Sequence, residues 1–137
     1  METKPADAVV WVPAPQEHFT GNVWFGALVG TDVDSGLQIV GVRFAARART
    51  HWHSHPQGQI LYVISGSALV GTRSGEVARI EPGGSVYALP GEQHWHGAAG
   101  DSDMVHLSLT RGEPTVWLGE PVPGDTYPAP AADSPSV

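Results

Sequence analysis

Residues 51–59 read His51-Trp52-His53-Ser54-His55-Pro56-Gln57-Gly58-Gln59, with three histidines at alternate positions. Side chains two residues apart point to the same face of a β-strand, so His53 and His55 point together. The chain has seven histidines, and three others lie in strand-like segments further along: His94, His96 and His106. Neutral imidazoles that converge on an interior face commonly bind a first-row transition metal. The sequence therefore predicts a histidine metal site that His94 completes from a neighbouring strand.

Short apolar stretches, separated by turn signals, fill the chain on both sides of this segment. Several alternate with period two, for example Val40, Val42 and Phe44, which is typical of strands with one buried face. The expected strands are residues 21–27, 37–44, 59–65, 67–71, 76–80, 85–89, 104–111 and 115–118. Many short strands at regular spacing predict an all-β sandwich or barrel.

Length and composition restrict the class of protein further. The chain has 137 residues, which suits one domain, and it has no cysteine, which excludes disulfides, thiolate metal sites and cysteine nucleophiles. Its formal net charge is −7 and its arginines are scattered, which argues against nucleic acid as a partner. No apolar run approaches the roughly 18 residues of a membrane span. The first residues also lack the pattern of a signal peptide, so we expect a cytoplasmic protein with no membrane partner.

The residues around the histidines carry a family resemblance. One set resembles the first cupin motif, in which a His-x-His pair is followed by a Glu and then a glycine: His53, His55, Gln59 and Gly66. Another set resembles the second cupin motif, which supplies the last histidine ligand: Gly84, Pro90, Gly91 and His94. The resemblance covers about residues 37–110. It implies a single-domain cupin β-barrel, a jelly-roll of two antiparallel sheets, and a homodimer, because small cupins commonly pair through an outer strand or sheet face.

The two ends of the chain differ from its middle in composition. We expect residues 1–20 to form an N-terminal arm or strand, residues 21–118 the barrel, and residues 119–137 a proline-rich tail. Residues 121–137 contain five prolines and few large apolar side chains, so the end of the tail should be mobile. The alternative is that Trp117 and Tyr127 pin part of the tail to a partner subunit.

Two positions depart from the cupin motifs. Gln59 stands where many cupins have Glu, and Ala98 stands where the second motif often has Asn. Glutamine coordinates only through a neutral carbonyl oxygen, so a bound dication would keep its full positive charge. This favours polarisation of a substrate oxygen over oxygen activation, although some cupin dioxygenases also lack a carboxylate ligand. The alternative interpretation of Gln59 is a residue at the start of a strand that hydrogen-bonds the loop.

A narrower resemblance links the chain to small bacterial cupins that include manganese-dependent hydroxynitrile lyases. It implies one divalent metal, Mn(II) or Fe(II) in the first place and otherwise Zn, Ni, Co or Cu, with these ligands: His53, His55, Gln59 and His94. It implies proton transfer by His106, and His96 is a second catalytic candidate that shares the strand face of His94. A structural role for His106, hydrogen-bonded to a ligand or to the backbone, is the alternative. His51 extends the ligand face toward a rim, and His18 lies in a polar stretch where it should be solvated.

The substrate pocket depends on which strand face looks inward. If Val40 and Val42 face the cavity, together with Thr110 from residues 104–110, the pocket is small and apolar and suits a compact aryl or alkyl molecule. If Arg43 faces inward instead, the substrate should carry a carboxylate. Trp52 and Trp95 alternate with the ligand candidates and should face away from the metal.

Three functions are compatible with this sequence. The first is a metal-dependent lyase of the hydroxynitrile-lyase type, which would cleave or form cyanohydrins by Lewis-acid polarisation and histidine proton transfer. The second is a cupin dioxygenase acting on a small aromatic or enediol substrate. The third is a non-redox cupin that binds a sugar acid. We place the lyase first because of Gln59 and the surroundings of His106, and in each case the partner is a small-molecule substrate.

Overall fold

The computed structural model describes residues 1–30, 36–100 and 102–125. Within these ranges two short 3₁₀ helices precede or interrupt the first strands: η1 (Ala6–Ala8) and η2 (Gln16–His18). The strands in the same ranges are β1 (Trp11–Pro13), β2 (Phe19–Thr20), β3 (Val23–Ala27), β4 (Leu37–Phe44), β5 (Arg49–Thr50), β6 (His53–Ser54), β7 (Gln59–Ser65), β8 (Ala68–Thr72), β9 (Val77–Ile80), β10 (Ser85–Ala88), β11 (His94–Ala98), β12 (Met104–Arg111) and β13 (Val116–Trp117). No helix in the described ranges is long and apolar enough to cross a membrane.

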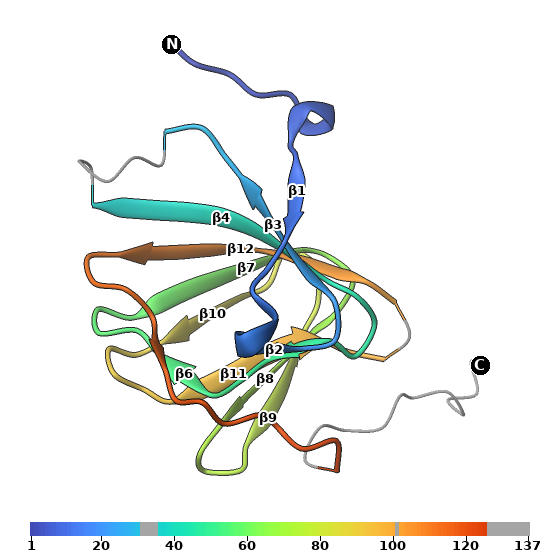
Figure 1. Ribbon diagram of the computed structural model, residues 1–137, viewed down its shortest axis with the longest axis vertical. Coiled ribbons are helices and arrows are strands. Elements are labelled where there is room, and N and C mark those ends of the chain that lie inside the picture. The colour runs from blue at the N-terminus through green and yellow to red at the C-terminus, as the bar shows by residue number, and fades with distance from the viewer. Residues whose placement is uncertain (31–35, 101, 126–137) are drawn as a thin grey trace.

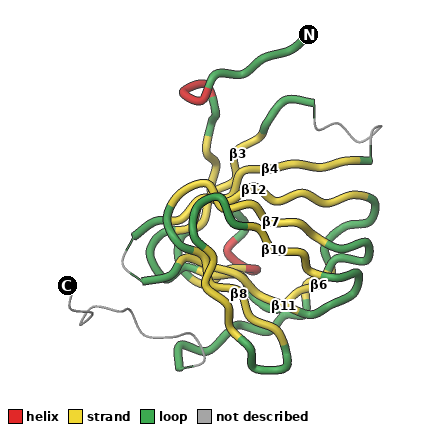
Figure 2. The backbone as a smooth tube through the Cα atoms, turned by 180° about the vertical axis from the view of Figure 1, so that it is seen from behind, coloured by secondary structure: helices red, strands yellow, loops and turns green. Residues whose placement is uncertain are grey.

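The strands form two antiparallel sheets that pack face to face (Figure 1). The first sheet has the order β1-β3-β4-β12-β7-β10, and the second has the order β13-β6-β11-β5-β2, with β8 joining β11 to β9. In the view from behind (Figure 2), the first sheet runs down to β10, and β8 and β11 of the second sheet lie below it. The predicted all-β, single-domain barrel of two antiparallel sheets is confirmed.

The long strands follow the sequence periodicity closely. The bounds of β4, β7 and β12 coincide with the predicted ranges 37–44, 59–65 and 104–111. The strand expected at residues 21–27 begins only at Val23, because Gly21 has a φ of 83° and lies in the turn before it. β6 and β11 fall in the segments that the alternating histidines indicated as strand-like. Three short strands lie outside every predicted strand range: β1 and β2, which fall in the predicted N-terminal arm or strand, and β5. They are two or three residues long, too short for period-two alternation to reveal them.

Alternating side chains from the two sheets form the core. Along β7, Gln59, Leu61 and Val63 are buried while Ile60 and Tyr62 between them are exposed. The main cluster between the sheets includes Phe19, Val42, Phe44, Val63 and Met104. A second cluster lies on the other face of the second sheet and contains Trp52, Leu69, Trp95, Ala99 and Val122. Both tryptophans that alternate with histidines therefore point away from the barrel interior.

Residues 115–122, called here the C-terminal strap, run along the segment that carries the first histidines. β13 pairs with β6, the amide of Trp52 donates to the carbonyl of Glu120, and Nε of Arg49 donates to the carbonyl of Val122. Val122 is 1% exposed. The first residues of the predicted tail thus dock on the barrel. Its expected mobile end, with Tyr127, lies outside the described residues.

Candidate metal centre

Strand register brings the first two histidines together. In the antiparallel pair β6–β11, His53 lies directly opposite His94. Side chains at opposed positions have Cβ atoms only about 5 Å apart. The two imidazole centroids are accordingly 4.3 Å apart, and both rings are almost completely buried. This pair forms the centre of the histidine cluster.

His55, in the turn between β6 and β7, and Gln59, the first residue of β7, reach the same place. The amides of Gly58 and Gly91 both donate to the carbonyl of His55, which holds this turn against the loop before β11. The ring of His55 lies 5.2 Å from that of His53, centroid to centroid. Gln59 is 4% exposed, and its Nε2 donates to Oγ of Ser108 at 2.8 Å. All four predicted ligands therefore converge inside the barrel.

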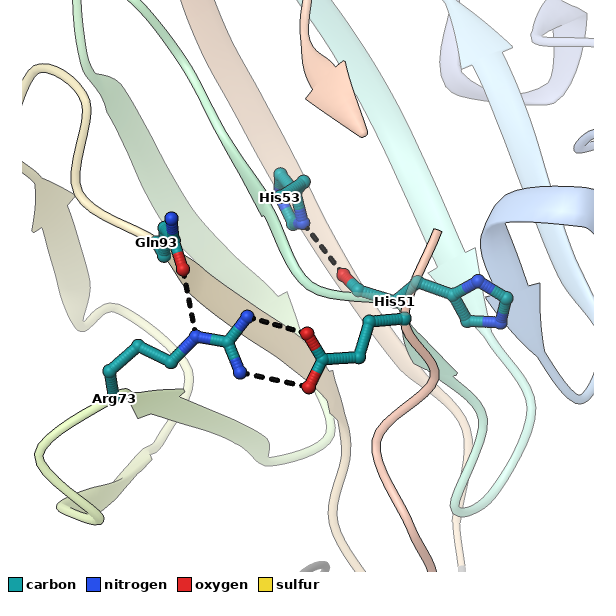
Figure 3. Close-up of polar contacts among 5 residues, drawn as sticks. His51, His53, Arg73 and Gln93 are labelled. Atoms are coloured by element: carbon teal, nitrogen blue, oxygen red, sulfur yellow. Dashed lines mark hydrogen bonds and ion pairs between the residues drawn. The ribbon is translucent and has the colours of Figure 1, made fainter. Parts of the chain in front are cut away.

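Hydrogen bonds orient three of the imidazoles. Nδ1 of His53 donates to the carbonyl of His51 at 2.9 Å (Figure 3), and Nδ1 of His94 donates to the carbonyl of Glu92 at 2.9 Å. Nδ1 of His55 lies 3.4 Å from Oγ1 of Thr115. An Nδ1–H bond of this kind fixes the tautomer and leaves Nε2 free, as in most histidines that bind metals.

The contact between His94 and Gln59 tests whether the site suits a cation. Nε2 of His94 lies 2.9 Å from Oε1 of Gln59. A neutral imidazole has one N–H, and His94 directs it to the carbonyl of Glu92, so two lone pairs face each other at this contact. Nε2 of His55 is buried, and no described residue forms a hydrogen bond with it. A metal ion accounts for both features, because it accepts electron pairs from all of these atoms.

His96 and His106 form a second, deeper pair. Nδ1 of His96 lies 3.0 Å from Nε2 of His106, and neither the Nε2 of His96 nor the Nδ1 of His106 has a hydrogen-bond partner among the described residues. His106 is 0% exposed and packs against Phe44, so it lies behind His96 as seen from the other histidines. Potential ligand atoms of His53, His94 and His96 all lie within 4.8 Å of one another. His96 is therefore a further residue that could hold a metal.

Burial keeps these imidazoles neutral. Desolvation, reinforced by the neighbouring histidines, lowers the pKa of His53 and of His96 well below its usual value. Desolvation also lowers the pKa of His94 and lowers the pKa of His55 and of His106 to about 4. Only the neutral form offers a lone pair to a metal or a proton, so the cluster is ready for either role.

A cavity of about 200 Å³ opens beside the histidines. Its lining includes Val40, Val42 and Thr110, whereas Arg43 points outward and pairs with Asp103 at 3.0 Å. The valine face of β4 is thus the inward one. His96 lines the cavity but His106 does not. Ser108 lines the cavity from the same strand face as Thr110. Other lining residues were not foreseen from the sequence: Phe19, Phe25, Gln38, Thr50, Thr115 and Trp117.

Trp117 and His18 depart from the expectations for them. Trp117 lies 4.8 Å from the ring of His53 and stacks on His18 at 4.2 Å, with an interplanar angle of 6°. Within the described residues Trp117 therefore packs against its own chain. The side chain of His18 is 28% exposed, so it is half-buried by this stacking where the polar sequence around it predicted solvation. The sequence holds only a weak signal for the stacking of Trp117 on His18, because a Trp near a proline-rich tail does not reveal which residue it contacts.

Comparison with known proteins agrees with this geometry. The model of the cupin domain family matches residues 41–110. The chain belongs to the cupin family. This cupin is 36% identical over 121 residues to the (R)-mandelonitrile lyase of Granulicella tundricola, a match that covers 86% of this chain and 92% of that protein.

Solved structures support the same assignment. A cupin-like protein from Thermotoga maritima is 38% identical, with a TM-score of 0.78 and coverage of 84% of this chain and 89% of that one. A polyketide cyclase from Streptomyces resistomycificus, 17% identical, has a TM-score of 0.74 over 93% of this chain and 90% of that one, which shows the shared fold alone. The curated relative and the buried three-histidine group support a metal-binding cupin enzyme with a small-molecule substrate.

Proposed function

We propose that this cupin is a lyase of the hydroxynitrile-lyase type. The observation that carries the proposal is the convergence of four neutral candidate ligands, His53, His55, Gln59 and His94, beside the buried His96–His106 pair. When bound there, Mn(II) or Fe(II) would supply Lewis-acid polarisation of the substrate oxygen. The relative named (R)-mandelonitrile lyase supports this reaction class.

The histidine pair suits the proton transfer that cyanohydrin cleavage needs. With Nδ1–H of His96 donating to Nε2 of His106, Nε2 of His96 is an unprotonated base at the cavity wall. It takes the hydroxyl proton as the carbon–carbon bond breaks, the electron pair of that bond leaves on cyanide, and a carbonyl forms. The protonated imidazole then returns its proton to cyanide, which releases hydrogen cyanide. His106 stabilises the charged ring in between.

The cavity favours a compact, uncharged substrate. Among the described residues, those that line it include no Asp, Glu, Lys or Arg. Phe19, Phe25 and Trp117 offer aromatic surface, and Val40 and Val42 limit the room beside them. A small aryl or alkyl cyanohydrin matches this lining, whereas a sugar acid would meet no Lys or Arg side chain among the described lining residues.

The test measures two products with one panel. Protein loaded with Mn(II) or with Fe(II) is given small aromatic cyanohydrins and enediols, and cyanide release and oxygen uptake are recorded together. Cyanide release without oxygen uptake is expected. Oxygen uptake without cyanide release would replace the lyase by a dioxygenase, and the absence of both would favour a binding role.

Replacing His106 tests the histidine pair. We expect His106→Ala to keep its metal but to lose turnover by about 10²-fold, the usual scale for a general base or its support. Loss of metal and of activity together, with recovery in excess Mn(II), would instead indicate that His106 only supports the ligands. Near-normal turnover at saturating Mn(II) would remove His106 from the mechanism and leave His96 alone.

We also propose a homodimer that forms through the outer face of the first sheet. Apolar side chains on β7, β10 and the residue after it are 44–58% exposed: Ile60, Tyr62, Ile64, Tyr87 and Leu89. An apolar surface of this kind on adjacent strands marks an interaction site. Sedimentation analysis should find a dimer that Tyr62→Lys dissociates, whereas Val77→Lys on β9 should leave it intact. A monomeric wild-type protein would contradict the proposal.

A further inference from the structure

Arg73, in the turn after β8, makes four contacts outside the barrel. Its Nη1 and Nη2 donate to the two carboxylate oxygens of Glu120 at 3.0 and 2.7 Å. Its Nε donates to Oε1 of Gln93 at 2.8 Å (Figure 3), and the guanidinium carbon lies 3.8 Å above the ring of Trp52. We call Arg73, Trp52, Gln93 and Glu120 the Arg73 clasp.

Two partners of Arg73 adjoin residues of the candidate metal site in the sequence, and the third lies in the C-terminal strap. Trp52 lies between His51, whose carbonyl orients His53, and His53 itself. Gln93 directly precedes His94. Glu120 belongs to the C-terminal strap, and its carbonyl accepts from the amide of Trp52. The Arg73 side chain thus links the C-terminal strap to the two segments that carry His53 and His94.

The strap itself contacts the ligands. Trp117 pairs with His53 in the β13–β6 ladder, and Oγ1 of Thr115 lies next to Nδ1 of His55. A strap that loosens would therefore release the backbone behind His53 and the contact that orients His55. The Arg79–Glu81 ion pair lacks this arrangement. Arg79 and Glu81 lie two residues apart in sequence and join no ligand segment.

We propose that Arg73 is a positioning residue that slows metal release by keeping the segments of His53 and His94 and the strap together. The inference rests on the proposed metal site. Isolated exposed ion pairs contribute little, and the side chains of Arg73 and Glu120 are 42% and 51% exposed. The clasp differs because a planar guanidinium that is bidentate to a carboxylate and stacked on an indole has few alternative positions.

The experiment follows the metal itself. The purified protein is loaded with Co(II), whose visible absorption reports the ligand geometry, and release is followed in a series of EDTA concentrations extrapolated to zero. Direct hydrogen-bond partners of ligands typically alter metal affinity by 10–100-fold, and Arg73 acts one step further out. We therefore expect Arg73→Met and Glu120→Gln each to release Co(II) about 3–10-fold faster, with the double variant no faster than Arg73→Met alone.

Matched variants separate positioning from stability and from charge. Arg79→Met removes an arginine of similar exposure and should release Co(II) at the wild-type rate. Arg73→Lys keeps the charge but loses the fork, so its release should remain fast. Wild-type release from Arg73→Lys would overturn the proposed geometry. A lower Tm for Arg73→Met with unchanged release would overturn the positioning role, and Glu120→Gln gives the same readout if Arg73→Met does not fold.

The failure of the clasp and the failure of the metal site give different results. If wild-type protein takes up no Co(II), the proposed metal function is wrong and the clasp falls with it. If wild-type protein binds one equivalent of Co(II) and Arg73→Met releases it no faster than Arg79→Met, the clasp alone is wrong. If the absorption bands of Arg73→Met also shift while its stoichiometry stays at one, the positioning role is supported directly.

Discussion

Replacing His106 with glutamine should flatten the pH dependence of stability in metal-free protein. His106 is 0% exposed, and burial lowers its pKa to about 4 from an ordinary value of 6.5. In the unfolded chain the imidazole takes up a proton more readily than in the folded one. The stability that depends on neutral His106 is therefore fully present above pH 6.5 and is lost as the pH falls toward about 4.

The size of the effect follows from the same two values. Each unit of pKa difference corresponds to about 1.4 kcal/mol, so His106 alone should remove about 2 kcal/mol from the free energy of unfolding between pH 7.5 and pH 5.0. His106→Gln lacks the titrating imidazole, so its free energy of unfolding should fall by about 2 kcal/mol less than that of the wild type between pH 7.5 and pH 5.0. Its amide oxygen still offers an acceptor to Nδ1 of His96, which limits the cost of the substitution at neutral pH.

The assay is urea unfolding of EDTA-treated protein, followed by circular dichroism at pH 7.5, 6.5, 5.0 and 4.0. Ser108→Ala is the control, because Ser108 is buried and polar but does not titrate, so this variant should keep the wild-type pH dependence. An identical pH dependence for His106→Gln and wild-type protein would refute the reasoning that burial keeps His106 neutral.

Three further predictions concern the ligands, a backbone position and the cavity. His94→Ala should lose stoichiometric Mn(II), whereas His96→Ala should retain it. Gln59→Ala should bind Mn(II) more weakly than the wild type, because water can replace a neutral oxygen ligand. Metal analysis after dialysis checks all three variants, and full occupancy in His94→Ala would contradict the ligand assignment. Gly66→Ala should destabilise the fold by more than about 2 kcal/mol, because Gly66 has a φ of 70° and a Cβ would clash with the carbonyl oxygen of Asp103. Gly100 has a φ of 58° but open space around it, so Gly100→Ala should cost only about 1 kcal/mol. Urea unfolding measures both values. Val42→Ala should enlarge the cavity and shift kcat/KM toward bulkier cyanohydrins by about 10-fold or more, and unchanged ratios would exclude Val42 from the pocket wall.

Much of the fold could be predicted because its long strands each have one buried face. The bounds of β4, β7 and β12 follow directly from alternation. The alternating histidines also indicated the segment of β6, which carries His53, whereas the two-residue strand β5 could not be found in this way. The position of β5 depends on pairing with β11, which is far away in the sequence. Long-range pairing of this kind leaves no local pattern.

The candidate site divides in the same way. Alternation and the spacing of the motifs indicated that His53, His55, Gln59 and His94 would meet, and the structure brings them together. The arrangement of His96 in front of His106 could not be predicted, because it depends on how β11 of one sheet faces β12 of the other. The place of Trp117 was also hidden, since only the pairing of β13 with β6 brings its ring beside His53.

The described cavity lining has no charged side chain, which agrees with the neutral candidate ligands and the neutral histidine pair. The chain has a net charge of −7 and therefore many carboxylates, yet none of them lies among the described residues that line the cavity. Burying an ionised group without a partner is costly, so a bound dication would be the dominant charge there. Its field would favour a substrate oxygen that becomes negative and would hold back protonation of His96, which keeps that base available. A glutamate at position 59 would partly neutralise the dication and so weaken both effects. Gln59 and the neutral histidine pair therefore both help to keep the charge of the dication available to the substrate.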